Sequence, residues 1–238
     1  PKPSNRIFRD IDSKNPISKM SLATVCLDDY LEADAINESQ KNYIENAIRD
    51  HKNILVTGKT AAGKTTLTTA LLRSVTAHDS TERIVAFQNT TNIVCDGTKY
   101  LPVKIEDDFS TPHLINHTMR MRPQRIIFDE IRRDDALHVI QAWQCSFSGN
   151  IGTLFSHDAA AALRFLEICM LDDDLEEDEN DERSNEFLHQ TIKQQLTEVV
   201  NIIIHIEQPH WGQIKLRTYE VTPTLYNGDY GLLSIPGE

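Results

Sequence analysis

The residues best suited to chemistry lie between positions 58 and 66, where two glycines enclose four residues and a lysine and two threonines follow. Gly58 to Thr65 reads G-x-x-x-x-G-K-T, the pattern of a phosphate-binding P-loop. Glycines let backbone N–H groups approach a polyphosphate, and the helix expected next adds its positive end. Lys64 offers a charge to the β- and γ-phosphates of ATP, and Thr65 offers a hydroxyl to Mg²⁺. We therefore predict a nucleotide site formed by Gly58, Lys59, Thr60, Ala61, Ala62, Gly63, Lys64, Thr65 and Thr66.

A second group of functional side chains follows at the end of an apolar run. Ile126 to Phe128 precedes two acids, Asp129 and Glu130. In P-loop ATPases this position holds the Walker B site, where the first acid orients water on Mg²⁺ and the second polarises the attacking water. Two solvated carboxylates at an ordinary strand end are the alternative. The P-loop upstream favours Asp129 as a metal residue and Glu130 as a catalytic one.

Short apolar runs alternate with helical patterns along most of the chain. The strands are expected at residues 54–56, 84–87, 126–128, 151–155 and 201–206. The helices are expected in pieces over residues 27–47, and at 63–77, 111–121, 134–146 and 158–170. This order predicts an α/β fold with a mostly parallel sheet, buried on both faces by flanking helices. Gln213 to Leu225 alternates in the manner of a hairpin or edge strand, and the P-loop has the strand before it and the helix after it that the motif requires.

Length and composition allow one large domain with at most a small appendage. The chain has 238 residues, of which 39% are hydrophobic, and no apolar run is long enough to span a membrane. No secretory signal pattern is present. We expect residues 1–21 to be an N-terminal remnant or linker and residues 22–238 to form the nucleotide-binding domain. The four cysteines are widely spaced, which argues against a zinc site and fits a reducing compartment.

The net charge of −12 is spread unevenly along the chain. Residues 172–183, DDDLEEDENDER, carry nine acids and one arginine. Such a run repels itself and predicts a solvated, mobile loop, with docking of a basic partner as the alternative. An acidic protein of this kind is not expected to bind nucleic acid directly with sequence specificity.

Several phrases together are more specific than the P-loop alone. Residues 119–127 read MRMRPQRII, and Glu130-Ile131-Arg132 follows. Residues 27–30 read LDDY, and residues 199–203 read VVNII. From about residue 22 onward the chain resembles the secretion-superfamily ATPases, and most of all the TrbB-like conjugal-transfer ATPases of type IV secretion.

This resemblance implies a RecA-like ATPase domain over residues 22–238 that binds ATP and Mg²⁺ and hydrolyses ATP. It also implies a homo-hexameric ring in a membrane-associated transfer or secretion complex. The protein would then be cytoplasmic and peripheral at the inner face of the membrane. On this resemblance, we expect the N-terminal domain of the family to be largely absent here.

The sequence departs from the family after its second strand. The family carries an acidic segment there, typically Glu-Asp-Thr-x-Glu, beside the γ-phosphate, and its last Glu is a candidate general base. Here Gln88, Asn89 and Asn92 replace the three acids. An amide keeps the shape and hydrogen-bonding reach of the acid but cannot accept the proton. The resemblance therefore makes Gln88 a nucleotide contact and Asn92 a residue at the catalytic position.

The histidine box of the family is also incomplete. Its Gly-His-Glu-Gly phrase corresponds to residues 146–149, which read SFSG and hold no histidine. The second histidine of the box, in a Thr-x-His phrase, is assigned to His157. By itself such a residue is more often a surface or structural histidine, but its place near a strand end makes it a candidate γ-phosphate sensor.

Arg120 and Arg122 precede the strand of the Walker B pattern. In a ring ATPase, an arginine from one subunit can contact the phosphate bound by its neighbour, and guanidinium is planar and always charged. Ordinary surface ion pairs are the alternative. Arg132 and Arg133 are weaker candidates.

Two functions of different classes fit these observations. One is a motor ATPase, supported by Lys64, Thr65, Asp129 and Glu130. The other is a nucleotide-binding structural or regulatory subunit with little hydrolysis, supported by the three amides. A small-molecule kinase is a weaker third, because no lid or acceptor-site motif is visible. We favour the ATPase.

Overall fold

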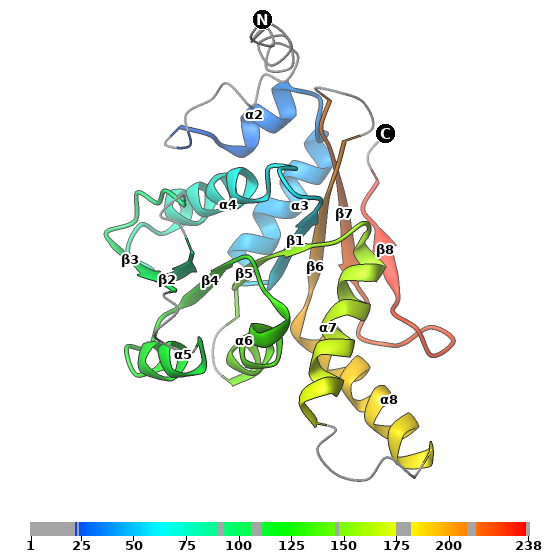
Figure 1. The fold of residues 1–238 in the computed structure, drawn as a ribbon. Helices are drawn as coiled ribbons and strands as arrows, with labels where there is room; N and C mark the ends of the chain where they lie inside the picture. Colours follow the sequence, from blue (N-terminus) through cyan, green and yellow to red (C-terminus); the bar gives the residue numbers. More distant parts are fainter. Residues whose placement is uncertain are drawn as a thin grey trace, which may run out of the picture.

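A single mixed sheet organises the part of the chain that the structure describes. This computed structural model describes residues 22, 24–89, 93–105, 111–145, 148–174, 182–208 and 213–236. Within these residues the sheet has eight strands in the order β3-β2-β4-β5-β1-β6-β7-β8, and all neighbours from β3 to β6 are parallel (Figure 1). The strands are β1 (Ile54–Gly58), β2 (Arg83–Gln88), β3 (Lys99–Lys104), β4 (Arg125–Asp129), β5 (Ile151–Phe155), β6 (Ile202–Glu207), β7 (Lys215–Val221) and β8 (Leu232–Ser234).

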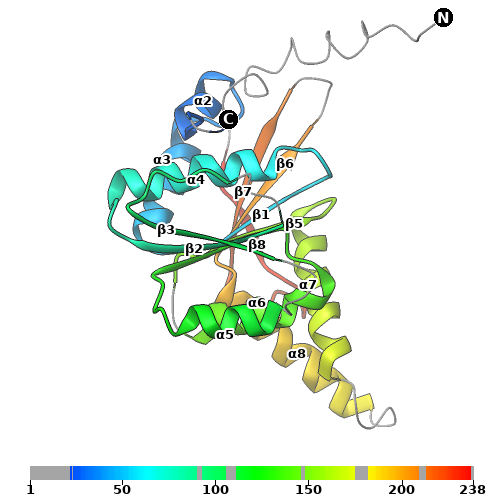
Figure 2. The ribbon, with the colours of Figure 1, turned by 60° about the vertical axis from the view of Figure 1, so that its left-hand side comes forward.

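The helices cover both faces of this sheet. They are α2 (Leu27–Glu32), α3 (Glu38–Arg49), α4 (Lys64–His78), α5 (Thr111–Met119), α6 (Arg133–Cys145), α7 (Ala159–Asp174) and α8 (Glu182–Val199). Figure 2 shows α2, α3 and α4 on one side of the sheet and α5 to α8 on the other. Because neighbouring side chains of a strand point to opposite faces, Leu55 packs with the α5–α8 layer, whereas Ile54 and Val56 pack with the α2–α4 layer.

These features confirm the predicted α/β fold, with its mostly parallel sheet. The expected strands and the four expected helices from residue 63 to residue 170 all form, with ends shifted by a few residues. The strand predicted in the tail, as part of a hairpin or as an edge strand, is β7. It pairs antiparallel with both β6 and β8, so it lies inside the sheet, and β8 forms the edge.

Three elements were not predicted, namely β3, α8 and the short strand β8. Strand β3 reads KYLPVK, and all of its residues are exposed or half-buried at the edge of the sheet, so it lacks a buried apolar run. Its lysines and Pro102 also discourage pairing with another chain at this edge. Helix α8 could have been found, because Leu188, Ile192, Leu196 and Val199 recur every three or four residues and meet the core.

The prediction of a mobile loop over residues 172–183 is wrong at both ends of the run. Helix α7 continues to Asp174, and α8 begins at Glu182. Asp172 forms an ion pair with Arg133 of α6, so this acid has a fixed partner rather than a place in a self-repelling loop. Residues 175–181, like residues 1–21, lie outside the described residues.

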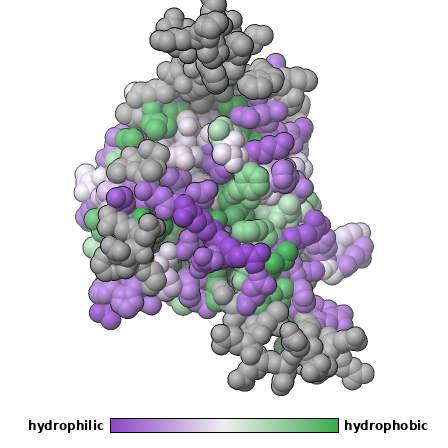
Figure 3. Space-filling view, viewed as in Figure 1, coloured by the Kyte–Doolittle hydropathy of each residue, from purple (hydrophilic) through white to green (hydrophobic). Residues whose placement is uncertain are grey.

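Hydrophilic residues predominate on the face shown in Figure 3, with a smaller hydrophobic area near its middle. Among the described helices, none combines the length and the apolar character needed to cross a membrane.

Candidate functional site

The predicted site residues meet at the edge of the sheet where the parallel strands end. Gly58 closes β1 and lies beside Phe155 of β5 and Ile206 of β6, and Asp129 closes β4. Ligands of open α/β sheets bind at this carboxyl edge. The fold therefore joins two segments that are 64 residues apart in sequence, Thr65 and Asp129.

The loop from Gly58 to Thr65, here called the glycine loop, uses backbone conformations that favour glycine. Gly63 has a φ of 98° and caps the N-terminus of α4, and Ala61 also has a positive φ, 60°. A Cβ on Gly58 would lie 3.2 Å from the carbonyl oxygen of Ile206. The loop thus turns tightly between β1 and α4, and the positive end of α4 faces the loop.

Lys64 is folded back over this loop. Its Nζ donates hydrogen bonds to the carbonyl oxygens of Gly58 at 3.1 Å and Lys59 at 3.0 Å. Partial burial lowers the pKa of Lys64, and the nearby Glu130 and Asp129 oppose that shift. The ammonium group therefore sits inside the curve of the loop, with acceptors that a phosphate group could replace.

Thr65 and Asp129 form the contact that links the glycine loop to β4. The Thr65 hydroxyl donates to Oδ1 of Asp129 at 3.0 Å. Burial raises the pKa of Asp129, while the hydrogen bond from Thr65 lowers it. A hydroxyl and a carboxylate at this distance are a donor set of the kind that Mg²⁺ prefers, so the residues present fit this ion.

Glu130 follows Asp129 in a backbone conformation that is uncommon for a residue with a side chain, with a φ of 77°. Its amide N–H donates to the Thr153 hydroxyl at 2.8 Å. Its side chain is 54% exposed, and its Oε2 lies 3.8 Å from Nη2 of Arg132. This carboxylate is therefore accessible to a water molecule in the site.

The structure places the other predicted residues less uniformly. Gln88 ends β2 beside Asp129, but it is buried, and its Oε1 accepts from the N–H of Ile93 at 3.1 Å while its Nε2 lies 3.4 Å from the Tyr100 hydroxyl. Both ends of the Gln88 amide therefore contact groups of the protein itself, Ile93 and Tyr100. Asn89 is half-buried, and Asn92 lies outside the described residues.

His157 is exposed just beyond β5, with its ring edge-on to Phe155 at 5.4 Å. The N–H of Ser156 donates to the Gly58 carbonyl at 3.3 Å, which keeps this segment beside the glycine loop. Phe155, not His157, has the Thr-x-His spacing from Thr153.

Arg120 and Arg122 are exposed at the start of β4, the end remote from Asp129. The length of β4 therefore separates them from Asp129 and from the glycine loop of their own chain.

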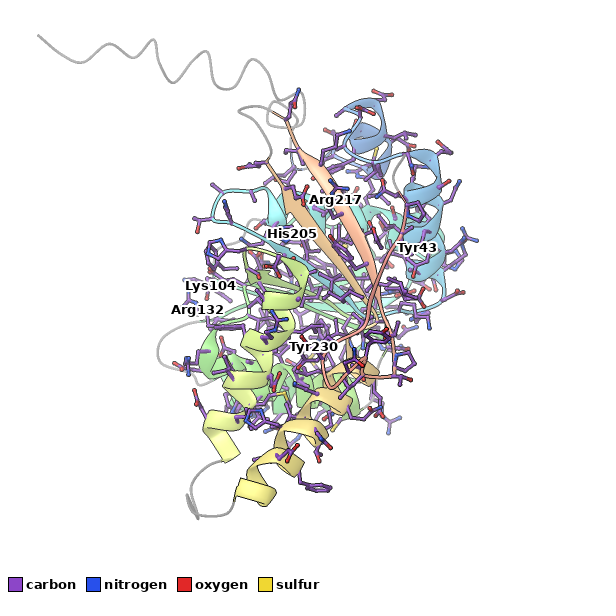
Figure 4. The ribbon with its side chains drawn as sticks, turned by 90° about the vertical axis from the view of Figure 1, so that its right-hand side faces the viewer. Tyr43, Lys104, Arg132, His205, Arg217 and Tyr230 are labelled. Carbon is purple, nitrogen blue, oxygen red and sulfur yellow. The ribbon has the colours of Figure 1, made fainter. Side chains whose placement is uncertain are left out.

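Sequence reasoning missed a histidine beneath the glycine loop. His205 of β6 is buried, and its Nδ1 lies 2.9 Å from the Thr57 hydroxyl, one residue before Gly58. Burial lowers the pKa of His205. Arg217 of β7 pairs with His205 of β6 in the sheet (Figure 4). The Arg217 Nε donates a hydrogen bond to the Glu207 carboxylate. A histidine inside the apolar run of β6 was the available signal.

Comparison with known proteins identifies the family. The family described as "Type II/IV secretion system protein" matches residues 17–208. The chain belongs to this family. It is 30% identical over 218 residues to a probable conjugal transfer protein TrbB of Sinorhizobium fredii, an alignment that covers 92% of this chain and 62% of the relative. It is also 30% identical over 132 residues to the type IV secretion system protein VirB11 of Bartonella quintana, which covers 53% of this chain and 36% of that protein.

These relatives confirm the resemblance to secretion-system proteins of the TrbB type. The chain spans about six-tenths of the length of the TrbB relative. Among solved structures, the VirB11 ATPase of the Brucella suis type IV secretion system superposes with a TM-score of 0.66 at 16% identity, covering 92% of this chain and 63% of that one. At 16% identity, this structural similarity supports the fold of the chain but not its function.

Proposed function

We propose that this protein binds ATP with Mg²⁺ and hydrolyses it as a motor subunit of a conjugation or type IV secretion-like transfer apparatus. The observation that carries the proposal is the 3.0 Å contact between Thr65 and Asp129. It joins the glycine loop to the acidic end of β4, and Glu130 follows directly.

The chain's own residues divide the work. The N–H groups of the glycine loop and the end of α4 would hold the phosphates. Lys64 would exchange its two carbonyl partners for phosphate oxygens, which is favourable because they carry full charge. Thr65 and Asp129 would hold Mg²⁺, which supplies charge neutralisation at the β- and γ-phosphates when bound. Glu130 would orient the attacking water and accept its proton.

The wider role rests on the relatives. The TrbB and VirB11 relatives belong to conjugal transfer and type IV secretion by name. We therefore propose a homo-hexameric ring in the cytoplasm, peripheral at the inner face of the membrane and without sequence-specific nucleic-acid binding. In such a ring Arg120 and Arg122 are candidates to contact the nucleotide of a neighbouring subunit, because they are exposed at the end of β4 opposite Asp129.

A nucleotide-binding subunit with little hydrolysis is the second candidate. Gln88, Asn89 and Asn92 stand where family members have acids, and the Gln88 amide is engaged by Ile93 and Tyr100. These substitutions leave the phosphate-binding groups intact and remove a candidate base. This candidate shares the binding step with the first and differs in turnover.

Binding is tested with Lys64→Ala, which removes the one side-chain cation of the glycine loop that is folded over it. ATP affinity, measured by titration with fluorescent ATP, should fall sharply. Lys52→Ala is the matched control, because Lys52 is exposed and precedes β1 at the opposite edge of the sheet. Unchanged affinity in Lys64→Ala would remove the nucleotide assignment.

Turnover separates the two candidates. Glu130→Gln should lower hydrolysis of ATP by about 10²–10⁴-fold, to a residual rate, while affinity is kept. Asn92→Glu should raise turnover, since a positioned general base contributes about 10²–10⁴-fold. If the unaltered protein already turns over at a normal motor rate and Asn92→Glu adds nothing, the chain is not a weakened enzyme.

The ring is tested by analytical ultracentrifugation with and without Mg-ATP. Oligomers should form with nucleotide, and Arg120→Ala with Arg122→Ala should lower turnover without lowering ATP affinity. A strict monomer at high protein concentration would contradict the ring.

A further inference from the structure

Thr153 holds the turn that carries Glu130. It lies in the middle of β5 and is 1% exposed. Its hydroxyl accepts the N–H of Glu130 at 2.8 Å, and its backbone carbonyl accepts the N–H of Ile131 at 2.7 Å. Thr153 therefore accepts hydrogen bonds from two consecutive backbone N–H groups in the segment that follows β4.

The pairing of the two strands explains why a side chain is needed here. The ladder between β4 and β5 pairs Ile127 with Ile151 and Phe128 with Gly152, and then stops. From Asp129 the backbone leaves the ladder, so the Glu130 amide points where no regular strand partner exists. The Thr153 hydroxyl supplies the missing acceptor.

The turn needs such support because its conformation is unfavourable. Glu130 has a φ of 77°, a region that side chains disfavour. On the far side, Ile131 is buried against Gly152, where a Cβ would come within 2.7 Å of its Cδ1. The hydroxyl of Thr153 and the packing of Ile131 together hold Glu130 in this state.

We propose that Thr153 is a positioning residue for the Glu130 carboxylate. This inference rests on the proposed function, in which Glu130 orients the attacking water. The carboxylate is half exposed and has Arg132 near it at 3.8 Å, too long for a hydrogen bond. Its direction is therefore set by the backbone of residue 130, which Thr153 fixes.

The test compares Thr153→Val, which removes the hydroxyl at nearly constant shape, with Thr153→Ser, which keeps it. Thr153→Val should lower kcat for ATP about 10- to 100-fold, since a misplacement near 1 Å costs about that much. Its affinity for ATP should stay unchanged. Thr153→Ser should retain kcat within about threefold, because the acceptor of the Glu130 amide is still present.

The Glu130→Gln background shows whether Thr153 acts through Glu130. There, Thr153→Val should cause no further loss of turnover. A further loss equal to that of the single variant would overturn the inference, because the hydroxyl would then act independently of the carboxylate. Full turnover in Glu130→Gln itself would instead overturn the proposed role of Glu130.

Amide hydrogen exchange gives a readout without turnover. In Thr153→Val the Glu130 amide should exchange faster, while the Ile131 amide, bound to a backbone carbonyl, keeps its protection. Unchanged exchange at Glu130 would overturn the inference even if turnover fell. An unfolded Thr153→Val would leave Thr153→Ser to decide, since loss of kcat in that variant contradicts a role for the hydroxyl.

Discussion

The two ends of strand β4 carry charged residues four positions apart, and their surroundings differ in kind. At the start, Arg125 is 1% exposed, and its guanidinium donates to Glu82, to the Gly149 carbonyl at 2.9 Å and to the Ile48 carbonyl at 2.8 Å. At the end, Asp129 is half-buried and accepts the Thr65 hydroxyl. One charge has its hydrogen bonds filled by the protein, whereas the other keeps room for further ligands.

This difference separates stability from binding along a single strand. A buried ion pair whose hydrogen bonds are complete fixes the elements around it, and removing one partner is costly. A desolvated carboxylate with one donor lowers stability until a cation arrives, which is a common cost of functional sites. We therefore expect variants at the start of β4 to lower stability without changing ATP affinity. Variants at its end should change ATP binding without lowering stability.

The largest effect is expected for Arg125→Met. It leaves the Glu82 carboxylate buried, at 3% exposure, without its main partner. The free energy of unfolding, measured with urea, should fall by about 3–5 kcal/mol, and ATP affinity of the folded fraction should not change. Arg49→Met, which removes an exposed arginine of α3, is the matched control and should cost little.

A double variant sharpens this prediction. Arg125→Met with Glu82→Leu leaves no buried charge at the start of β4, so it should be more stable than Arg125→Met alone. If the double variant is the less stable of the two, the cost lies in packing and in the carbonyls of Ile48 and Gly149 rather than in the uncompensated carboxylate.

Gly149→Ala should have the next largest effect. Gly149 has a φ of 89°, and a Cβ there would lie 2.4 Å from Nη1 of Arg125. Backbone strain costs about 1–2 kcal/mol, and displacing the guanidinium adds to it. Gly228→Ala isolates the strain, since Gly228 has a φ of 79° and nothing lies within 4 Å of its Cβ position. Equal losses in the two variants would show that the contact with Arg125 does not matter.

Thr57→Val tests a pair that combines both kinds of surroundings. Thr57 and His205 are buried at the carboxyl edge, directly before the glycine loop. Losing the hydroxyl leaves His205 Nδ1 without its partner, so stability should fall by about 1–3 kcal/mol and ATP affinity should fall with it. Thr68→Val is the control, because the Thr68 hydroxyl is buried without a hydrogen-bond partner among the described residues. A loss of stability with unchanged affinity would place this pair with Arg125.

The same pair predicts a dependence on pH. Burial lowers the pKa of His205 in the folded state. As pH falls below 6.5, His205 gains a proton in the unfolded chain but remains neutral in the folded protein. The free energy of unfolding therefore decreases as pH decreases. His205→Gln should remove this part of the slope. A slope of the same size in the variant would contradict the assignment to His205.

Local patterns predicted the carboxyl end of β4 better than the amino end. Gly58, Lys64 and Asp129 stand in motifs whose spacing is short, and the order of strands and helices brings them to one edge. The ion pair of Arg125 with Glu82 joins residues 43 positions apart, and no pattern connects them. The sequence pattern of residues 119–127 included Arg125 but predicted no contact or function for it.

The contacts of Thr153 and Gln88 were also beyond prediction. Thr153 reaches Glu130 only because β4 leaves the ladder after Phe128, which is a property of the paired strands. The Gln88 amide contacts the backbone of Ile93, five residues further along the chain. Neither propensity nor periodicity specifies contacts of this kind.

The smallest effect on stability, and the only expected gain, belongs to Asp129→Asn. Burial raises the pKa of Asp129 above its ordinary value of 3.8, so the folded protein binds this proton more tightly than the unfolded chain. The free energy of unfolding therefore decreases as pH rises from 3.8 to the folded pKa, and the cost remains at neutral pH. Asn carries no charge, so the variant should be slightly more stable than the parent at pH 7, and the two should converge at low pH.

Mg²⁺ should at the same time lose its effect on ATP affinity, because a carboxylate oxygen is gone. Asp50→Asn, at an exposed position after α3, is the control for removal of a charge. Urea unfolding across pH, with ATP titrations with and without Mg²⁺, measures both effects. If Asp129→Asn is less stable than the parent at pH 7, this carboxylate stabilises the fold as the Arg125 pair does, and the contrast between the two ends of β4 does not hold.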